Sequence, residues 1–276
     1  MLDNKTALII GIFLLLLFSI AYAHEAEEET HEESTINAHS LVSSSFKYMI
    51  IASVISLLFI IISLYIREKS EKVKWILFLA IIIPVIASTA YLAYSTVYLN
   101  LVSETQGPVH WHADYEVWVC DEKAELVKPK GISNRIGSPL FHDHGDSRIH
   151  VEGVVADTRN VDLHSFFQTV GGDLDADILE IPKENEVVKV KNGDLCNGEE
   201  AKLQAFVYKV INADNAKSWI FEQEKIGNFP KYILSPYSNV PPGDCIIIEF
   251  GPESEKTGHI CATYEAAMQR GELVGS

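Results

Sequence analysis

The chain has 276 residues, of which 38 are acidic and 22 basic, so its formal net charge is −16 at neutral pH. This acidic balance, without a basic patch, argues against nucleic acid as a partner. Apolar side chains are concentrated before residue 103, whereas the remainder has the composition of an acidic globular domain. Composition therefore predicts an N-terminal part associated with a lipid bilayer, followed by one folded domain.

Residues 1–23 have the pattern of an export signal. Lys5 precedes an uncharged apolar run at 7–20, and the Ala-Tyr-Ala at 21–23 fits the small-x-small cleavage rule. We predict a signal peptide over residues 1–23, with an uncleaved anchor helix as the alternative. Residues 24–45 are rich in glutamate and contain no basic residue, so we predict an acidic, disordered external segment there.

Two charge-free runs follow, each long enough to cross a membrane as a helix. The first, residues 48–66, covers nineteen positions; the second, residues 75–103, is longer and contains Pro84, which we expect to kink it. We predict a two-helix transmembrane hairpin over residues 46–103. The short connection between the runs has a basic excess, with Arg67, Lys69, Lys72 and Lys74 against Glu68 and Glu71.

These charges predict the orientation in the cell membrane. A short loop with a basic excess belongs on the cytoplasmic side, so the acidic segment and the C-terminal domain are predicted to be extracytoplasmic. An N-terminal export signal requires the same topology. No CxxC pair is present, which argues against a thioredoxin-type centre or a zinc ribbon. An even cysteine count in an oxidising compartment predicts two disulfides, with three connectivities open, among Cys120, Cys196, Cys245 and Cys261.

Residues 104–276 form the predicted external domain, in which alternation of apolar and polar residues is the main signal. The first strand has Trp111, Ala113, Tyr115, Val117 and Val119 on its expected core face, and His110, His112, Asp114, Glu116 and Trp118 on the other. A second strand near 149–155 repeats this alternation, and a loop rich in proline and glycine, residues 128–146, connects the two strands.

The sequence of the rest of the domain predicts more strands and a short helix. Asp162 can cap that helix, which ends before a Gly-Gly pair, and residues 214–224 are interpreted as a helix or an anchored loop. The expected architecture is a mainly β domain, a sandwich or small barrel with one or two short helices. The expected elements are a helix at 162–170 and strands at 186–190, 203–210 and 245–250.

Five of the ten histidines fall between residues 110 and 150, mostly in pairs separated by one residue. Residues two apart on a strand point to the same side, so such pairs converge their side chains. Imidazole with carboxylate is a ligand set for divalent transition metals, zinc or copper first. We predict one site that contains His110, His112 and at least one more histidine, with the others as outer contacts or ligands of a second ion. The candidate ligands are His110, His112, His142, His144, His150, Glu152 and Glu116.

Other roles for histidine are open at this point. Strand histidines can bond the backbone, loop histidines can be solvated, and apposed imidazoles can sense pH. The remaining histidines are set aside: His24, His31 and His39 in the acidic segment, His164 on a helix surface, and His259 near the C-terminus.

Two resemblances bear on this cluster. His110-x-His112 followed by Glu116 is similar to the HxHxxxE spacing of cupin metal sites, although the glycine-bearing turn of that motif is replaced by residues 120–123. The run from 108 to 172 resembles exported histidine-rich domains of archaea and some bacteria, which show an HxH strand, a histidine pair, an IHxE strand and an LGxFF helix start. Here His-Asp-His-Gly stands at the second pair, and His164 replaces the usual glycine. The resemblance implies an extracytoplasmic domain and no established activity.

We therefore expect a membrane-anchored, extracytoplasmic metal-binding protein that captures, delivers or senses zinc or copper. A metal-dependent enzyme that uses the same histidines, with Glu116 or Glu152 as general base, is the first alternative. A subunit of a larger membrane complex is the second. The expected partners are the lipid bilayer, a metal ion and, for the second alternative, other membrane subunits.

Overall fold

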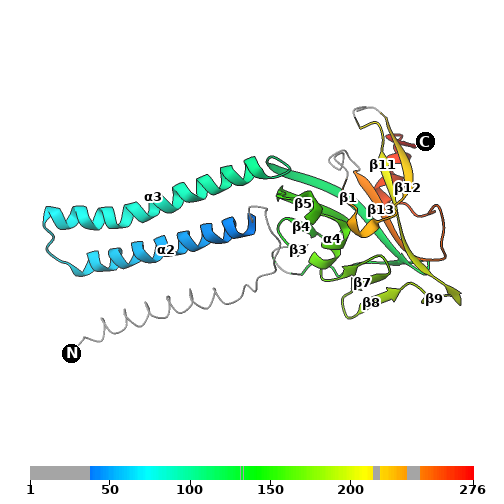
Figure 1. Cartoon of the computed structure of the whole chain (residues 1–276), viewed down its shortest axis with the longest axis horizontal. Coiled ribbons are helices and arrows are strands. Elements are labelled where there is room, and N and C mark those ends of the chain that lie inside the picture. The colour runs from blue at the N-terminus through cyan, green and yellow to red at the C-terminus, as the bar shows by residue number, and fades with distance from the viewer. Residues whose placement is uncertain (1–37, 131, 133, 214–217, 235–242) are drawn as a thin grey trace. The chain divides into compact units, whose positions relative to one another are not determined.

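A computed structural model describes residues 38–276, apart from 131, 133, 214–217 and 235–242 (Figure 1). The predicted signal peptide and most of the predicted acidic segment lie outside the described residues. Two long helices come first, α2 (Ala38–Tyr65) and α3 (Glu71–Val102), and a mainly β domain follows.

The two helices have the length and composition that the charge-free runs predict. Residues 43–65 and 71–102 are each apolar enough to cross a membrane. Helix α2 begins at Ala38, so the end of the segment predicted to be disordered is helical instead. The reason is compositional, because the glutamates end at residue 33 and the residues after them are uncharged as far as Lys47. Helix α3 continues through Pro84, and its N-terminus is capped by the Ser70 hydroxyl, which accepts from the Val73 amide.

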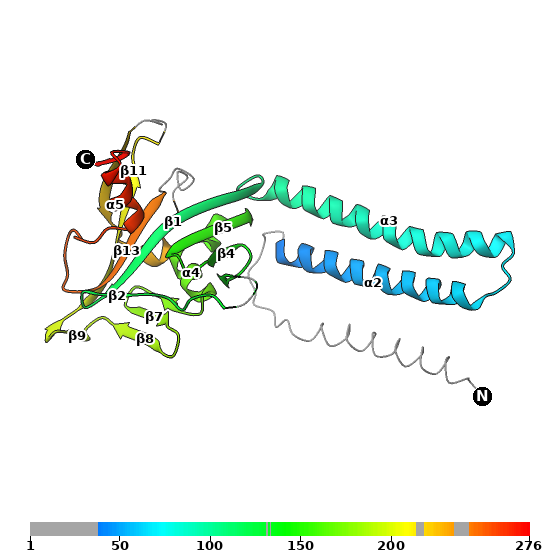
Figure 2. The ribbon, with the colours of Figure 1, turned by 180° about the vertical axis from the view of Figure 1, so that it is seen from behind.

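One large mixed sheet dominates the β domain (Figures 1 and 2). Its strands follow one another in the order β14, β12, β11, β13, β1, β5, β4 and β3, and β2 pairs with β1. The β1–β13 and β12–β14 pairs are parallel, and the others are antiparallel. The strands are β1 (Pro108–Val119), β2 (Glu122–Ala124), β3 (Ile136–Gly137), β4 (Phe141–Asp143), β5 (Arg148–Val154), β11 (Lys202–Val210), β12 (Trp219–Lys225), β13 (Asp244–Gly251) and β14 (Leu273–Gly275).

Smaller elements complete the domain. A three-stranded sheet and a two-stranded sheet stand apart from the large one in the hydrogen-bonding pattern. The three-stranded sheet consists of β6 (Asp173–Leu174), β7 (Ile178–Pro182) and β8 (Val187–Lys191), the two-stranded one of β9 (Leu195–Cys196) and β10 (Glu199–Glu200), and the helical segments are η1 (Thr158–Asn160), α4 (Leu163–Thr169), η2 (Phe229–Lys231) and α5 (Ala262–Gln269).

The first face of the large sheet packs on the main core, as the alternation in β1 predicts. Ala113, Tyr115 and Val117 are buried there, together with Phe166 and Phe167 of α4. The cap predicted for α4 is present, because the Asp162 carboxylate accepts from the Ser165 amide. The small sheet β6–β7–β8 contributes Leu174, Leu179 and Ile181 to the same core.

The second face is not simply a solvated polar face. Near β13 and β11 this face carries a second apolar cluster, which α5 covers. The cluster includes Phe206, Ile247 and Tyr264. The prediction of a helix or loop near residue 219 is wrong, because β12 is a strand that pairs with β11 over residues 221–225. The domain is mainly β with a few short helices, as predicted. Its nine-stranded sheet has α4 on the first face and α5 on the second, and the small sheet β6–β7–β8 packs into the same core as α4.

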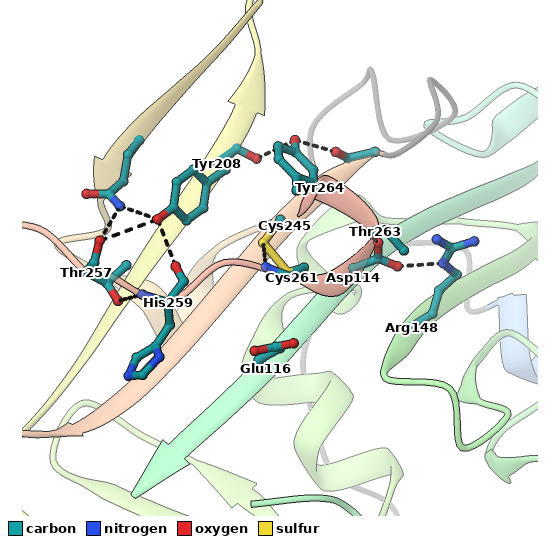
Figure 3. Close-up of a disulfide and its surroundings, with 12 residues drawn as sticks. Asp114, Glu116, Arg148, Tyr208, Cys245, Thr257, His259, Cys261, Thr263 and Tyr264 are labelled. Carbon is teal, nitrogen blue, oxygen red and sulfur yellow. Dashed lines mark hydrogen bonds and ion pairs between the residues drawn. A yellow bond between two sulfur atoms is a disulfide. The ribbon is translucent and has the colours of Figure 1, made fainter. Parts of the chain in front are cut away.

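Two disulfides connect the four cysteines, as the even count predicts. Cys120 is bonded to Cys196, and Cys245 is bonded to Cys261 at the start of α5. The second bond fixes the beginning of α5 to β13 on the second face of the sheet (Figure 3).

Candidate metal centre

The histidines gather on the second face, at the side of the sheet where β1, β5 and β4 are neighbours. In the strand register His112 lies opposite His150, and His150 lies opposite His142 on its other side. Opposite residues in antiparallel strands have Cβ atoms about 5 Å apart, so three imidazoles form a row across three strands. His110 and Glu152, which are also paired, come next along the same face.

Five histidines form two groups of three that share one member. We call His110, His112 and His150 the outer trio, and His142, His144 and His150 the inner trio. Within each trio one ring nitrogen from every residue lies within 4.8 Å of the others. Both trios have the ligand type and spacing needed to hold a metal ion.

The buried rings lack ordinary partners. His142 is 1% exposed and His150 is 8% exposed. Among the described residues, neither His142 Nδ1 nor either ring nitrogen of His150 has a hydrogen-bond partner. The oxygens of Glu152 and Asp146 are each 3.9 Å from a nitrogen of His150, beyond hydrogen-bond length. Leaving a buried polar atom unpaired costs roughly 1–3 kcal/mol, and coordination of a metal ion by these nitrogens would offset that cost.

Burial also keeps these rings neutral. It lowers the pKa of His150 to about 4, with a further lowering by His112, while Asp146 opposes the shift. Burial likewise lowers the pKa values of His112 and His142. A neutral imidazole has a free lone pair, so near neutral pH these side chains are ready to coordinate a metal.

Glu152 stands beside both trios. Its Oε1 atom is 2.9 Å from His110 Nε2, and its Oε2 atom is 4.0 Å from His142 Nε2. Its side chain is 40% exposed, so the carboxylate is open to solvent. Such a group can serve as a ligand or hold the ring of a ligand in place.

The loop after β4 orients the inner trio. The hydroxyl of Tyr115 donates to Asp143 Oδ2 at 2.7 Å, and Asp143 Oδ1 accepts from the amides of Gly145 and Asp146. Gly145 has a φ of +82°, and a Cβ there would lie 2.7 Å from the ring of Pro129. His144 Nδ1 is 2.5 Å from the carbonyl oxygen of Asn134. Since a carbonyl accepts, Nδ1 carries the proton and Nε2 keeps the lone pair.

An ion pair closes the cluster on the side toward α5 (Figure 3). Asp114 and Arg148 are paired in the register one step along the same face, and Arg148 Nε donates to Asp114 at 2.6 Å. The same carboxylate accepts from Thr263 of α5. Sequence reasoning missed Asp143, Arg148 and Thr263, although Asp114 was already on the histidine face by alternation.

The structure brings six of the seven predicted ligands together and separates Glu116 from them. Glu116 is buried farther along β1, where Lys123 Nζ is 2.6 Å from its carboxylate and Trp118 Nε1 donates at 3.1 Å. Four residues along a strand place it roughly 13 Å beyond His112, too far to share an ion with the trios. The HxHxxxE spacing therefore does not form a cupin-like ligand set here.

Two of the five histidines that we set aside have partners of their own. His164 was predicted to be a surface residue, but its side chain is only 24% exposed, and Nδ1 is 2.8 Å from the Leu174 carbonyl oxygen. His259 stacks on Trp118 with ring centroids 3.7 Å apart. His24 and His31 lie outside the described residues, and His39 lies in the first turn of α2.

No known protein family, curated protein or solved structure matches this chain. The resemblance to exported histidine-rich domains thus stays a prediction from the motifs alone, and the case for function depends on the geometry of the two trios.

Proposed function

We propose that this is a membrane-anchored protein whose C-terminal domain binds zinc or copper outside the cytoplasm, for capture, delivery or sensing. The observation that carries the proposal is the set of three unpartnered nitrogens on His142 and His150, placed inside two histidine trios. Nitrogen-rich sites of this kind suit zinc and copper better than calcium or magnesium, which prefer oxygen.

Two observations support the membrane and extracytoplasmic parts of the proposal. The helices α2 and α3 are apolar along lengths that can cross a bilayer, and the connection between them has a basic excess. The two disulfides of the β domain suit an oxidising compartment. Metal would then reach the trios from outside the cell membrane.

Elemental analysis of the full chain, purified in detergent, tests the proposal. All proteins in this test carry His24→Ala, His31→Ala and His39→Ala, so that the acidic segment does not contribute. We expect bound zinc or copper in the parent and its loss when alanine also replaces all five histidines of the trios. A matched control, His164→Ala with His259→Ala, should keep the metal. Equal metal content in the parent and the five-alanine variant would overturn the proposal.

A metal-dependent enzyme is the second candidate, and the exposed carboxylate of Glu152 beside His110 favours it. X-ray absorption on the metal-loaded protein separates the two functions. A shell closed by protein ligands indicates storage or delivery, whereas three protein ligands with one water indicate a site open to substrate, as in catalytic zinc centres.

A further inference from the structure

The number and grouping of the histidines exceed what one ion needs. A tetrahedral ion takes four ligands, whereas five histidines gather in this centre. Here the ring nitrogens fall into two groups of three, with His150 in both. The rings of His110 and His150 have centroids 6.5 Å apart, whereas His112 and His144 are each 4.7 Å from His150. His150 is thus flanked by one neighbour from each trio.

We propose that the centre binds two metal ions, one in each trio, and that His150 coordinates both through its two ring nitrogens. The proposal rests on the proposed metal binding and adds the number of ions and the ligand that joins them. When the second ion binds His150, it replaces the remaining ring proton, which passes to solvent.

The state of His150 is the main support. Both of its nitrogens are buried, and neither has a hydrogen-bond partner among the described residues. A metal-binding histidine usually donates its second nitrogen to a carbonyl or carboxylate. His144 follows that rule with the carbonyl of Asn134. No described residue offers such an acceptor to either nitrogen of His150, so both nitrogens are available to metal.

The two ions would occupy different surroundings. The outer trio includes His110, whose side chain is 63% exposed, and lies against the solvent-open carboxylate of Glu152. The inner trio includes His142, which is 1% exposed. We therefore expect the inner ion to be retained and the outer ion to exchange first when a chelator is added.

Copper(II) titration of the full chain in detergent tests the proposal, in the background without His24, His31 and His39. Bound copper is counted after desalting, and electron paramagnetic resonance reports unpaired spins. We expect two copper ions per chain. The resonance should grow through the first equivalent and fall by more than half through the second, because a shared imidazole couples the two spins. Zinc(II) should bind with the same stoichiometry.

The possible counts separate this proposal from the one it rests on. No bound copper or zinc would refute the proposed function. One ion per chain would leave the proposed function standing and overturn the two-ion centre. Two copper ions with an undiminished resonance would overturn the sharing of His150.

Variants assign the ions to the trios. His110→Ala with His112→Ala should leave one ion that resists chelator, and His142→Ala with His144→Ala should leave one that exchanges readily. His150→Ala should weaken both sites at least tenfold and abolish the spin coupling. His164→Ala is the matched control and should keep two coupled ions. Circular dichroism checks that each variant folds. If His150→Ala misfolds, the metal content of the two double variants tests the proposal instead. Loss of both ions in either double variant would contradict two separate sites.

Discussion

Two regions on the second face of the same sheet differ in how their polar atoms are satisfied. In the region that α5 covers, the hydroxyl of Tyr264 lies within hydrogen-bond distance of the backbone carbonyl oxygens of Tyr208 and Gly243. The hydroxyl of Tyr208 donates to the backbone carbonyl of His259. In the histidine region, both ring nitrogens of His150 are buried and have no hydrogen-bond partner in the part of the chain that the structure describes. Trp219 and Gln223 also leave an atom unpaired, but only one each.

We infer from this difference that the α5 region contributes to stability and the histidine region to ligand binding. The α5 region is closed by a disulfide and by apolar packing, so it has no need of a ligand to be stable. The histidine region keeps several neutral imidazoles together at the cost of unmet hydrogen bonds. Proteins accept such a cost where a ligand removes it on binding, which is why the comparison points to the histidines.

The largest expected effect is on the α5 region. Cys245→Ala with Cys261→Ala should lower the free energy of unfolding by about 3 kcal/mol, because the bond closes a loop of 16 residues. Urea unfolding followed by near-ultraviolet circular dichroism measures it. The metal content of the folded variant should match the parent, and joint loss of metal and stability would show that the two regions depend on each other.

In the histidine region a substitution should have the opposite sign. His150→Leu keeps a similar volume and removes the unpaired nitrogens, so the metal-free protein should gain about 2 kcal/mol of unfolding free energy. Added zinc should then stabilise the parent but not the variant. Thermal melts with and without zinc measure both effects. A metal-free variant that is less stable than the parent would mean that the ring packs as an ordinary core residue.

A smaller loss of stability is expected when the hydrogen bond that links the two regions is removed. Thr263→Val removes the hydrogen bond from α5 to Asp114 and should cost about 1 kcal/mol. Thr263→Ser, which keeps the hydroxyl, is the control. The comparison is made by urea unfolding, and a loss in Thr263→Ser with none in Thr263→Val would assign the effect to the methyl group instead.

The smallest effect is expected at a histidine outside the trios. His259→Ala removes the stack on Trp118 and should cost about 0.5 kcal/mol, since the ring is partly exposed. Metal content should not change. A drop in bound metal would show that histidines outside the two trios also take part.

Much of the candidate site could be predicted from local pattern. His110 and His112 are separated by one residue, which places both on the same side of a strand, and β1 and β5 have the alternation that the sequence predicts. The helix at Leu163 followed from its Asp162 cap and apolar spacing. Alternation also places Glu116 on the histidine side of β1, yet its carboxylate pairs with Lys123 and not with the histidines. Alternation predicts which face of a strand a residue occupies, but not whether residues far apart along that face can meet.

The sequence by itself determined which residues of β1 and β5 share a face, where the apolar helices run, and that two disulfides are available, because these follow from short-range periodicity and composition. Only the tertiary structure decided that His150 stands between His112 and His142, that Cys245 bonds Cys261, and that α5 covers part of the histidine face. Those outcomes depend on which strands become neighbours. That choice is made by packing between segments far apart in the chain, here β1 with β13, and no local pattern encodes it.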